Sequence, residues 1–221
     1  TVPLYPTGQS WTFVARGTSS GDAIDANFGQ RPFSATPPDS AVPLSTHTLA
    51  TVAVTDPSVY FQNVLYDGTG STQSISGVGF QPDFVWTKRR NVSGTNHMIF
   101  DSVRGATKFI GSDRTTAETT VADTLTSFDS DGFTLGADAG GYGTNVSTSS
   151  SKYLAYCWKA GDSNTAVSES GSGSGAINAC THRASTTSGL SIIKYTGLND
   201  EISNGEHTLV THGLGSAPVF M

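Results

Sequence analysis

The stretch "KYLAYCWK", Lys152–Lys159, is apolar on both sides when it is laid out as a β-strand. Successive side chains of a strand point to opposite faces, so alternate residues form two groups. One group is Leu154, Tyr156 and Trp158, and the other is Tyr153, Ala155 and Cys157. Apolar residues on both faces are typical of a strand inside a two-layer sandwich rather than of a sheet that faces water on one side. We therefore predict that this segment is a central strand of a β-sandwich.

Further strand candidates recur along the chain, separated by turn signals such as Asp67-Gly68 and Asn204-Gly205. Thr115–Leu125 comes nearest to the apolar spacing of an amphipathic helix, but it is rich in threonine. The fold class is predicted to be all-β: antiparallel β-sandwich modules in tandem, of jelly-roll or concanavalin-like type, with little or no helix. The predicted strands are Ser10–Arg16, Thr48–Val54, Val59–Tyr66, Asp83–Lys88, His97–Phe100, Thr107–Ile110, Gly132–Leu135, Lys152–Lys159, Leu190–Thr196 and Thr208–Thr211.

One phrase of the sequence occurs twice. Gly77–Gly79 and Gly213–Gly215 each reach a proline three residues later and then enter an apolar run. Upstream of them, "VLYDG" (Val64–Gly68) matches "IIKYTG" (Ile192–Gly197) in the same order. Because these matches keep their order, we infer an internal repeat whose second copy begins near residue 190.

Composition divides the chain into five segments. Residues 1–35 resemble the end of one domain, 36–45 a proline-rich linker, and 46–160 a complete β-sandwich. Residues 161–189 are predicted to be a Gly/Ser-rich linker or loop, and 190–221 the start of a second, truncated repeat. Since a final strand alone would lack a pairing partner, we expect these residues to be an internal window of a longer polypeptide.

Charge and cysteine usage exclude several classes of protein. Charged residues make up 14% of the chain and the net charge is −6, with no basic face of the kind that binds phosphates, so no nucleic-acid partner is predicted. The longest apolar run, Tyr153–Trp158, is far shorter than the roughly 20 residues of a membrane span, so no membrane insertion is predicted. The two cysteines, Cys157 and Cys180, are predicted to be reduced thiols rather than a disulfide.

The segment "ADAGGYGTNVS", Ala137–Ser147, offers the candidate ligand site. Tyr142 lies among glycines and Asn145 follows three residues later. A ring displayed on such a loop can stack on a sugar, and an amide can bind its hydroxyl groups. Alternatively, the tyrosine folds back over the sandwich edge as a structural residue.

Metal and catalytic sites have weaker support. Asp129 and Asp131 are spaced as in a calcium loop, yet the remaining EF-hand ligands are missing and the same residues suit a hairpin turn. Gly171–Gly175 spells a nucleophile elbow within a flexible segment, and no pair of carboxylates stands out for glycoside hydrolysis. Three histidines lack a partner at ligand spacing: His97, His182 and His212. We predict no enzyme, no catalytic residue, no metal and no cofactor.

At "NFGQRPF" (Asn27–Phe33), followed by "TPP" (Thr36–Pro38), the sequence resembles the closing strand of SPRY-type modules in phage virion proteins. The downstream phrases resemble the β-rich domain that commonly follows such a module in fibre and tail-associated proteins of bacteriophages. These phrases are "GFQPDFVWTK" (Gly79–Lys88), "HMIFDSVRGATK" (His97–Lys108), "LTSFDSDGFTLG" (Leu125–Gly136), "YLAYCWKAG" (Tyr153–Gly161) and "HGLGSAP" (His212–Pro218).

The resemblance implies a structural protein of a bacteriophage virion, with residues 1–35 as the C-terminal end of a SPRY-like sandwich. A tail fibre or tail-associated adhesin that contacts the host surface is the leading expectation. The alternatives are a capsid-decorating fibre, a carbohydrate-binding, lectin-like module and a polysaccharide-degrading spike. The implied partners are further copies of the chain in a homotrimer, other virion proteins and a host surface glycan or receptor. The implied location is the virion, assembled in the host cytoplasm and exposed on the extracellular particle.

Overall fold

The structure, a computed structural model, describes residues 54–146, 151–171, 175–197 and 208–221. The predicted segments 1–35 and 36–45, the strand Ser10–Arg16 and almost all of the strand Thr48–Val54 lie outside the described residues. Within the described part, all strand pairs of the three sheets are antiparallel. The same part has no helix with the length and apolar character that a membrane crossing requires. The predicted all-β class is confirmed.

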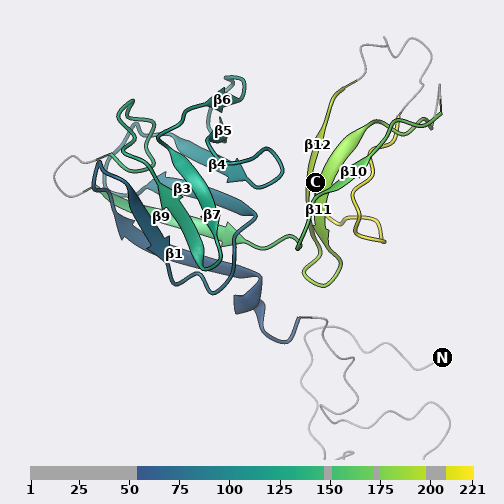
Figure 1. The fold of residues 1–221 in the computed structure, drawn as a ribbon, viewed down its shortest axis with the longest axis horizontal. Helices are drawn as coiled ribbons and strands as arrows, with labels where there is room; N and C mark the ends of the chain where they lie inside the picture. Colours follow the sequence, from purple (N-terminus) through teal and green to yellow (C-terminus); the bar gives the residue numbers. More distant parts are fainter. Residues whose placement is uncertain (1–53, 147–150, 172–174, 198–207) are drawn as a thin grey trace, which may run out of the picture. The chain divides into compact units, whose positions relative to one another are not determined.

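The largest sheet has six strands in the order β1-β9-β3-β4-β5-β6 (Figure 1). The segment Lys152–Trp158 is strand β9, which lies between β1 and β3 and pairs with β1 over its whole length and with β3 from Tyr153 to Trp158. The predicted central position of this strand is therefore confirmed. The strands are β1 (Phe61–Asp67), β9 (Lys152–Trp158), β3 (Phe84–Arg89), β4 (His97–Asp101), β5 (Lys108–Gly111) and β6 (Thr119–Thr120).

A three-stranded sheet covers one face of the six-stranded sheet. It has the order β2-β8-β7, with β2 at Gln73–Ser76, β8 at Gly132–Leu135 and β7 at Leu125–Asp129. Buried apolar side chains of both sheets form one core, in which the rings of Tyr66 and Phe133 meet edge to face at 6.2 Å. The two-layer β-sandwich is confirmed, while the jelly-roll or concanavalin-like type and the tandem arrangement remain predictions.

A tight turn joins β7 to β8 and holds the loop that follows β2. The carboxylate of Asp131 accepts hydrogen bonds from the backbone N–H groups of Gly79 (2.6 Å) and Gly77 (3.1 Å). Gly132 has φ 152°, and a Cβ there would lie 1.9 Å from the carbonyl oxygen of Ile75, so only glycine fits. The Asp-Gly signal therefore marks a structural turn.

Residues 161–189 differ from the prediction of a linker or loop. They contain β10 (Thr165–Val167) and β11 (Cys180–Ser185), which form a three-stranded sheet with β12 (Leu190–Tyr195) in the order β10-β11-β12. The Gly/Ser-rich part lies only between β10 and β11, where Ser170 and Ile177 form an isolated antiparallel bridge. The strands β10 and β11 are short or carry many polar residues, so their sequences lack a clear apolar alternation, which is why composition misplaced the segment.

Other strand predictions differ at their ends or were missing. Val59, predicted to begin a strand, belongs to the 3₁₀ turn η2 (Pro57–Val59), because Asp56 accepts the Ser58 N–H at 3.0 Å and Pro57 favours the turn. The predicted strand Thr208–Thr211 is wrong, since only Leu209 forms an isolated bridge there. Five strands were not predicted: β2, β6, β7, β10 and β11.

The repeated phrase has the same backbone conformation in both copies. Gly77 and Gly79 have φ values of 86° and 83°, and Gly213 and Gly215 have 73° and 75°. These positive values explain why both positions of both copies are glycine. The repeat itself remains a prediction, because the following apolar run forms β3 in the first copy but not in the second.

Candidate functional site

The amide of Asn145 is a structural group, so its predicted role in ligand binding is wrong. The residue is 0% exposed. Its nitrogen Nδ2 donates to the carbonyl oxygens of Ser71 (2.7 Å) and Gly136 (2.6 Å), and its oxygen Oδ1 accepts from Thr69 N (2.9 Å) and Gln73 Nε2. Because both amide atoms are buried and already bonded, Asn145 ties the loop to the start of β2 instead of facing a ligand.

Asp138, which the sequence analysis did not single out, shapes the same loop. It is 2% exposed, has φ 53°, and its carboxylate accepts backbone N–H bonds from residues 142–145 at 2.7–3.1 Å. The half-buried Tyr142 packs on the core, with its ring centroid 5.3 Å from that of Phe109. Of the two alternatives for Tyr142, the structure supports the one in which the ring folds back over the sandwich edge.

The residues considered for metal binding lie in turns or apart from one another. Asp131 holds the glycine loop, and Asp129 accepts hydrogen bonds from Ser127 (2.7 Å) and Thr134 (2.6 Å). The bonds from Gly79 and Gly77 hold the pKa of Asp131 below its ordinary value of 3.8. The described residues contain no group of three or more His, Cys, Asp or Glu that could hold a metal ion.

The outer face of the six-stranded sheet carries a row of aromatic side chains. Strand register places Trp158 opposite Phe61 on one side and Phe84 on the other, with ring centroids 4.9 and 5.3 Å apart. Tyr156 lies opposite Trp86 at 6.0 Å and next to Trp158 at 6.1 Å. We call these five rings the aromatic face: Phe61, Phe84, Trp86, Tyr156 and Trp158.

The aromatic face is more exposed to solvent than we expect for a surface of apolar side chains. Phe61 is 38% exposed and the other four rings are half-buried, while the flanking Leu65 and Ile110 are 65% and 39% exposed. On the inner face of the same strand, Tyr153 and Cys157 are 0% exposed. The expectation that both faces of β9 lie inside the sandwich is therefore wrong for the outer face. Contiguous exposed apolar surface of this kind commonly marks an interaction site.

A pocket of about 240 Å³ opens at one end of the aromatic face. Two of the face's rings, together with the ring of Tyr60, form much of its wall. Ser188, in the turn between β11 and β12, and Leu190, at the start of β12, line another part of the wall, so residues from two different sheets line the pocket. The residues that line it are Val54, Pro57, Tyr60, Phe61, Trp158, Lys159, Ser188 and Leu190.

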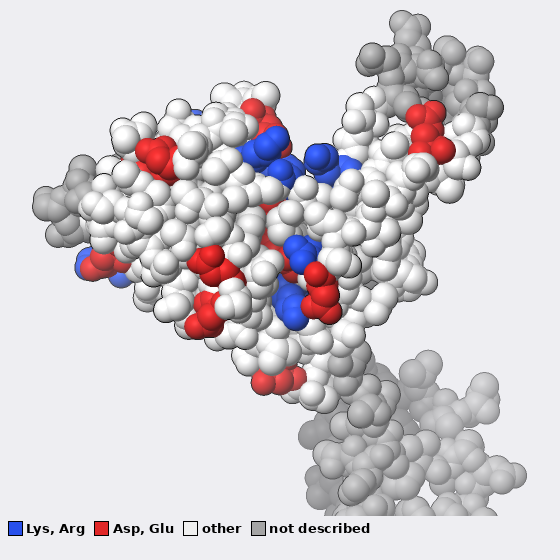
Figure 2. Space-filling view, in the orientation of Figure 1, with Lys and Arg blue, Asp and Glu red and all other residues white. Residues whose placement is uncertain are grey.

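Charged side chains are sparse on the described surface. Figure 2 shows them as single residues or small groups on a face that consists mostly of uncharged residues. Lys159, which lines the pocket, pairs with Asp162 at 3.3 Å. A surface of this kind favours uncharged ligands or neutral protein surfaces over phosphates.

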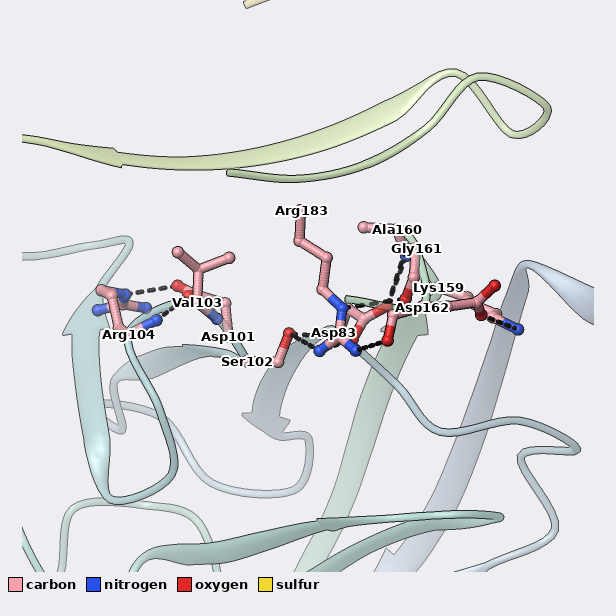
Figure 3. Close-up of polar contacts among 10 residues, drawn as sticks. All are labelled: Asp83, Asp101, Ser102, Val103, Arg104, Lys159, Ala160, Gly161, Asp162 and Arg183. Atoms are coloured by element: carbon pink, nitrogen blue, oxygen red, sulfur yellow. Dashed lines mark hydrogen bonds and ion pairs between the residues drawn. The ribbon is translucent and has the colours of Figure 1, made fainter. Parts of the chain in front are cut away.

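The loop before β3 is joined to β11 by a buried ion pair (Figure 3). Asp83 is 1% exposed, and its carboxylate lies 2.8 Å from the guanidinium nitrogen Nη1 of Arg183. The same carboxylate accepts hydrogen bonds from Ser102 Oγ (2.9 Å) and from the backbone N–H groups of Ala160 (2.9 Å) and Gly161 (3.2 Å). With these partners the buried charge is fully compensated.

We call the ion pair of Asp83 and Arg183, with its hydrogen bonds, the joint. Figure 3 shows the side chain of Arg183 extending from β11 toward Asp83. It donates from Nε to the carbonyl oxygen of Gly161 (3.0 Å) and from Nη2 to that of Asp162 (2.8 Å). A Cβ at Gly161 would lie 2.5 Å from the carbonyl oxygen of Ala184, so only glycine allows this approach. The joint therefore fixes β11, and with it the turn that lines the pocket.

Comparison with known protein families covers most of the chain. Residues 56–221 match a family model described as Domain of unknown function (DUF7483). No curated protein and no solved structure matches the chain. The matched range runs without a break through residues 161–189 and 190–221, which composition had assigned to a linker and a second repeat.

Proposed function

Because this chain belongs to the DUF7483 family, whose description names no function, we propose a function from its geometry and from its sequence resemblance: a non-enzymatic adhesion module of a bacteriophage virion. In this proposal the chain is part of a tail fibre or tail-associated adhesin, and its aromatic face contacts the host surface. The virion context rests on the resemblance of the sequence to phage fibre proteins. Assembly as a homotrimer with other virion proteins belongs to the same proposal.

The observation that carries the proposal is the aromatic face itself. Five rings lie next to one another on a sheet whose opposite face is already filled by the core. Folding alone does not require large aromatic residues at half-exposed positions, whereas binding sites are enriched in Trp and Tyr. The face is therefore best explained as a surface that binds.

The carboxylates support binding rather than catalysis. Asp83 and Asp138 are buried, and their carboxylates accept hydrogen bonds that hold loops in place. Asp101 accepts a hydrogen bond from the backbone and forms a salt bridge with Arg104. A glycoside hydrolase needs two carboxylates that face a substrate. Aspartates that hold loops in place instead give a rigid scaffold, which suits a binding module.

Competition for the host surface tests the proposal. Host cells are incubated with the purified chain and then with the phage that encodes it, and adsorption is measured as the decrease in free phage. We expect the chain to reduce adsorption and the double variant Trp86→Ala, Trp158→Ala to lose most of this effect. Lys152→Ala, a change of an exposed residue at the end of β9, is the control and should compete as well as the unchanged chain.

Labelling of the particle provides a second readout. Antibodies raised against the purified chain should bind to tail appendages in electron micrographs of intact virions. Virions without label, together with unchanged adsorption in the competition experiment, would contradict the proposal. Label on the capsid instead of the tail would support the capsid-decorating alternative.

A further inference from the structure

We infer that the pocket at the end of the aromatic face binds one neutral pyranose ring of a surface glycan. The inference rests on the proposed function, since it names the ligand of the same surface. The pocket's volume of about 240 Å³ lies below the roughly 300–1,000 Å³ of sites for drug-sized ligands. A space of this size accommodates a single sugar ring, whereas a peptide segment needs a longer groove.

The walls match the two kinds of surface that a pyranose presents. The ring centroids of Phe61 and Trp158 lie 4.9 Å apart with the planes tilted by 47°, so the two rings pack together and form a continuous aromatic part of the pocket wall. Carbon-bound hydrogens on the faces of a sugar ring pack on such aromatic planes. This contact provides area without requiring a buried charge.

Polar groups lie where the hydroxyl groups of a sugar would reach. Ser188 lines the pocket, and its hydroxyl donates to the carbonyl oxygen of Lys159 across 3.5 Å, a long contact that leaves the hydroxyl able to bind a ligand. Tyr60 adds an amphipathic ring, and its carbonyl oxygen accepts the Lys159 N–H at 2.8 Å, which fixes both residues relative to each other. A few fixed polar groups in an apolar wall are the usual basis of orientation and specificity.

The charges around the pocket indicate an uncharged ligand. Lys159 is its one charged wall residue among those described, and Asp162 pairs with it at 3.3 Å. No carboxylate lines the pocket in the described part of the chain. An apolar wall without a carboxylate, whose one lysine already has a partner, suits an uncharged ligand such as a neutral hexose.

The pocket depends on the joint between the sheets. Ser188 and Leu190 come from the turn between β11 and β12 and from the start of β12, while the aromatic wall comes from β1 and β9. The ion pair between Asp83 and Arg183 holds β11 against the loop before β3. Binding should therefore require both the rings and an intact joint.

The test uses the fluorescence of Trp158. Since the chain has three tryptophans, the substitutions Trp11→Phe and Trp86→Phe leave Trp158 as the only reporter. Because Trp86 belongs to the aromatic face, saturation-transfer NMR with the unsubstituted chain measures the same binding without this substitution. Methyl β-D-galactopyranoside and methyl β-D-glucopyranoside are the probes, with glycerol as the control for a general solvent effect. We expect a saturable change with at least one sugar at millimolar concentration and a merely linear change with glycerol.

A matched pair of variants locates the binding. Ser188→Trp fills the pocket. Because the new tryptophan would add to the fluorescence of Trp158, sugar binding to this pair of variants is measured by saturation-transfer NMR instead. Thr186→Trp places the same side chain on the same turn at an exposed position outside the pocket wall. We expect Ser188→Trp to weaken binding by at least about tenfold and Thr186→Trp to leave it unchanged. Circular dichroism confirms that each variant is folded.

Two outcomes would overturn the inference: no saturable binding of either sugar to the folded chain, or binding that Ser188→Trp leaves unchanged. The adsorption experiment separates this failure from a failure of the proposed function. If the chain blocks adsorption but binds no sugar, the adhesin proposal stands and the pyranose assignment is wrong. If sugar binds at the pocket while adsorption is unaffected, the site stands and the adhesin proposal is wrong.

Discussion

The two faces of strand β9 have nearly the same chemical character and very different surroundings. Tyr153 and Cys157 are 0% exposed beneath the sheet β2-β8-β7, whereas Tyr156 and Trp158 are half-buried on the opposite face. Apolar alternation therefore identifies a strand but does not say which of its faces is core. What distinguishes core from binding surface is whether a second layer covers it.

The largest expected difference between the faces comes from removing the same side chain on each side. Tyr153→Ala should lower the free energy of unfolding by about 3–5 kcal/mol, because it leaves a cavity against Tyr66, whose ring lies 5.1 Å away. Tyr156→Ala on the outer face of the same strand should cost less than about 1.5 kcal/mol. Urea denaturation of both variants measures the difference, and equal losses would show that both faces are core.

The joint provides the next effect in size. Arg183→Ala should lower the free energy of unfolding by about 3 kcal/mol, at the lower end for unpairing a buried charge, because Asp83 keeps its other donors. The control is Lys152→Ala, which breaks an exposed pair with Asp67 and should cost less than about 1 kcal/mol. Similar small losses for both variants would mean that the joint does not hold the sheets.

High pH should lower the free energy of unfolding through ionisable groups that are buried on the inner face. Burial raises the pKa of the Cys157 thiol from 9.0 to about 12, and burial also raises the pKa values of Tyr66 and Tyr153 above 10.0. The unfolded chain ionises these groups first, so the contribution of the thiol to stability is complete below pH 9.0 and is lost between pH 9.0 and about 12. Denaturation curves across this range measure the loss, and Cys157→Ala should reduce its earliest part. Constant stability up to pH 12 would contradict the burial of the thiol.

The smallest effect is expected at the loop that the sequence favoured as a sugar site. Tyr142→Ala should lower the free energy of unfolding by about 1–2 kcal/mol, because the half-buried ring loses its contact with Phe109. Sugar binding, measured by saturation-transfer NMR, should not change. Loss of binding in this variant would show that the sugar site lies in the loop of Tyr142 and not at the aromatic face.

Local pattern was enough to predict the all-β class and about half of the observed strands, and it was insufficient for the sites. Gly132–Leu135 was predicted with its correct ends because a tight Asp-Gly turn precedes an alternating segment. Asn145 was misassigned because an amide after glycines looks available, and only its contacts with distant residues such as Ser71 show that it is buried. The pocket could not be predicted, since it joins residues from the β11–β12 turn to β1 and β9.

Hydroxyl-radical footprinting of the folded chain, read by mass spectrometry on the peptide that spans Lys152–Lys159, tests the difference between the two faces most directly. We predict oxidation of Tyr156 and Trp158 and protection of Tyr153 and Cys157, in alternation along one strand. Equal protection of all four side chains would show that the aromatic face is covered in the folded protein and would contradict its role as a binding surface.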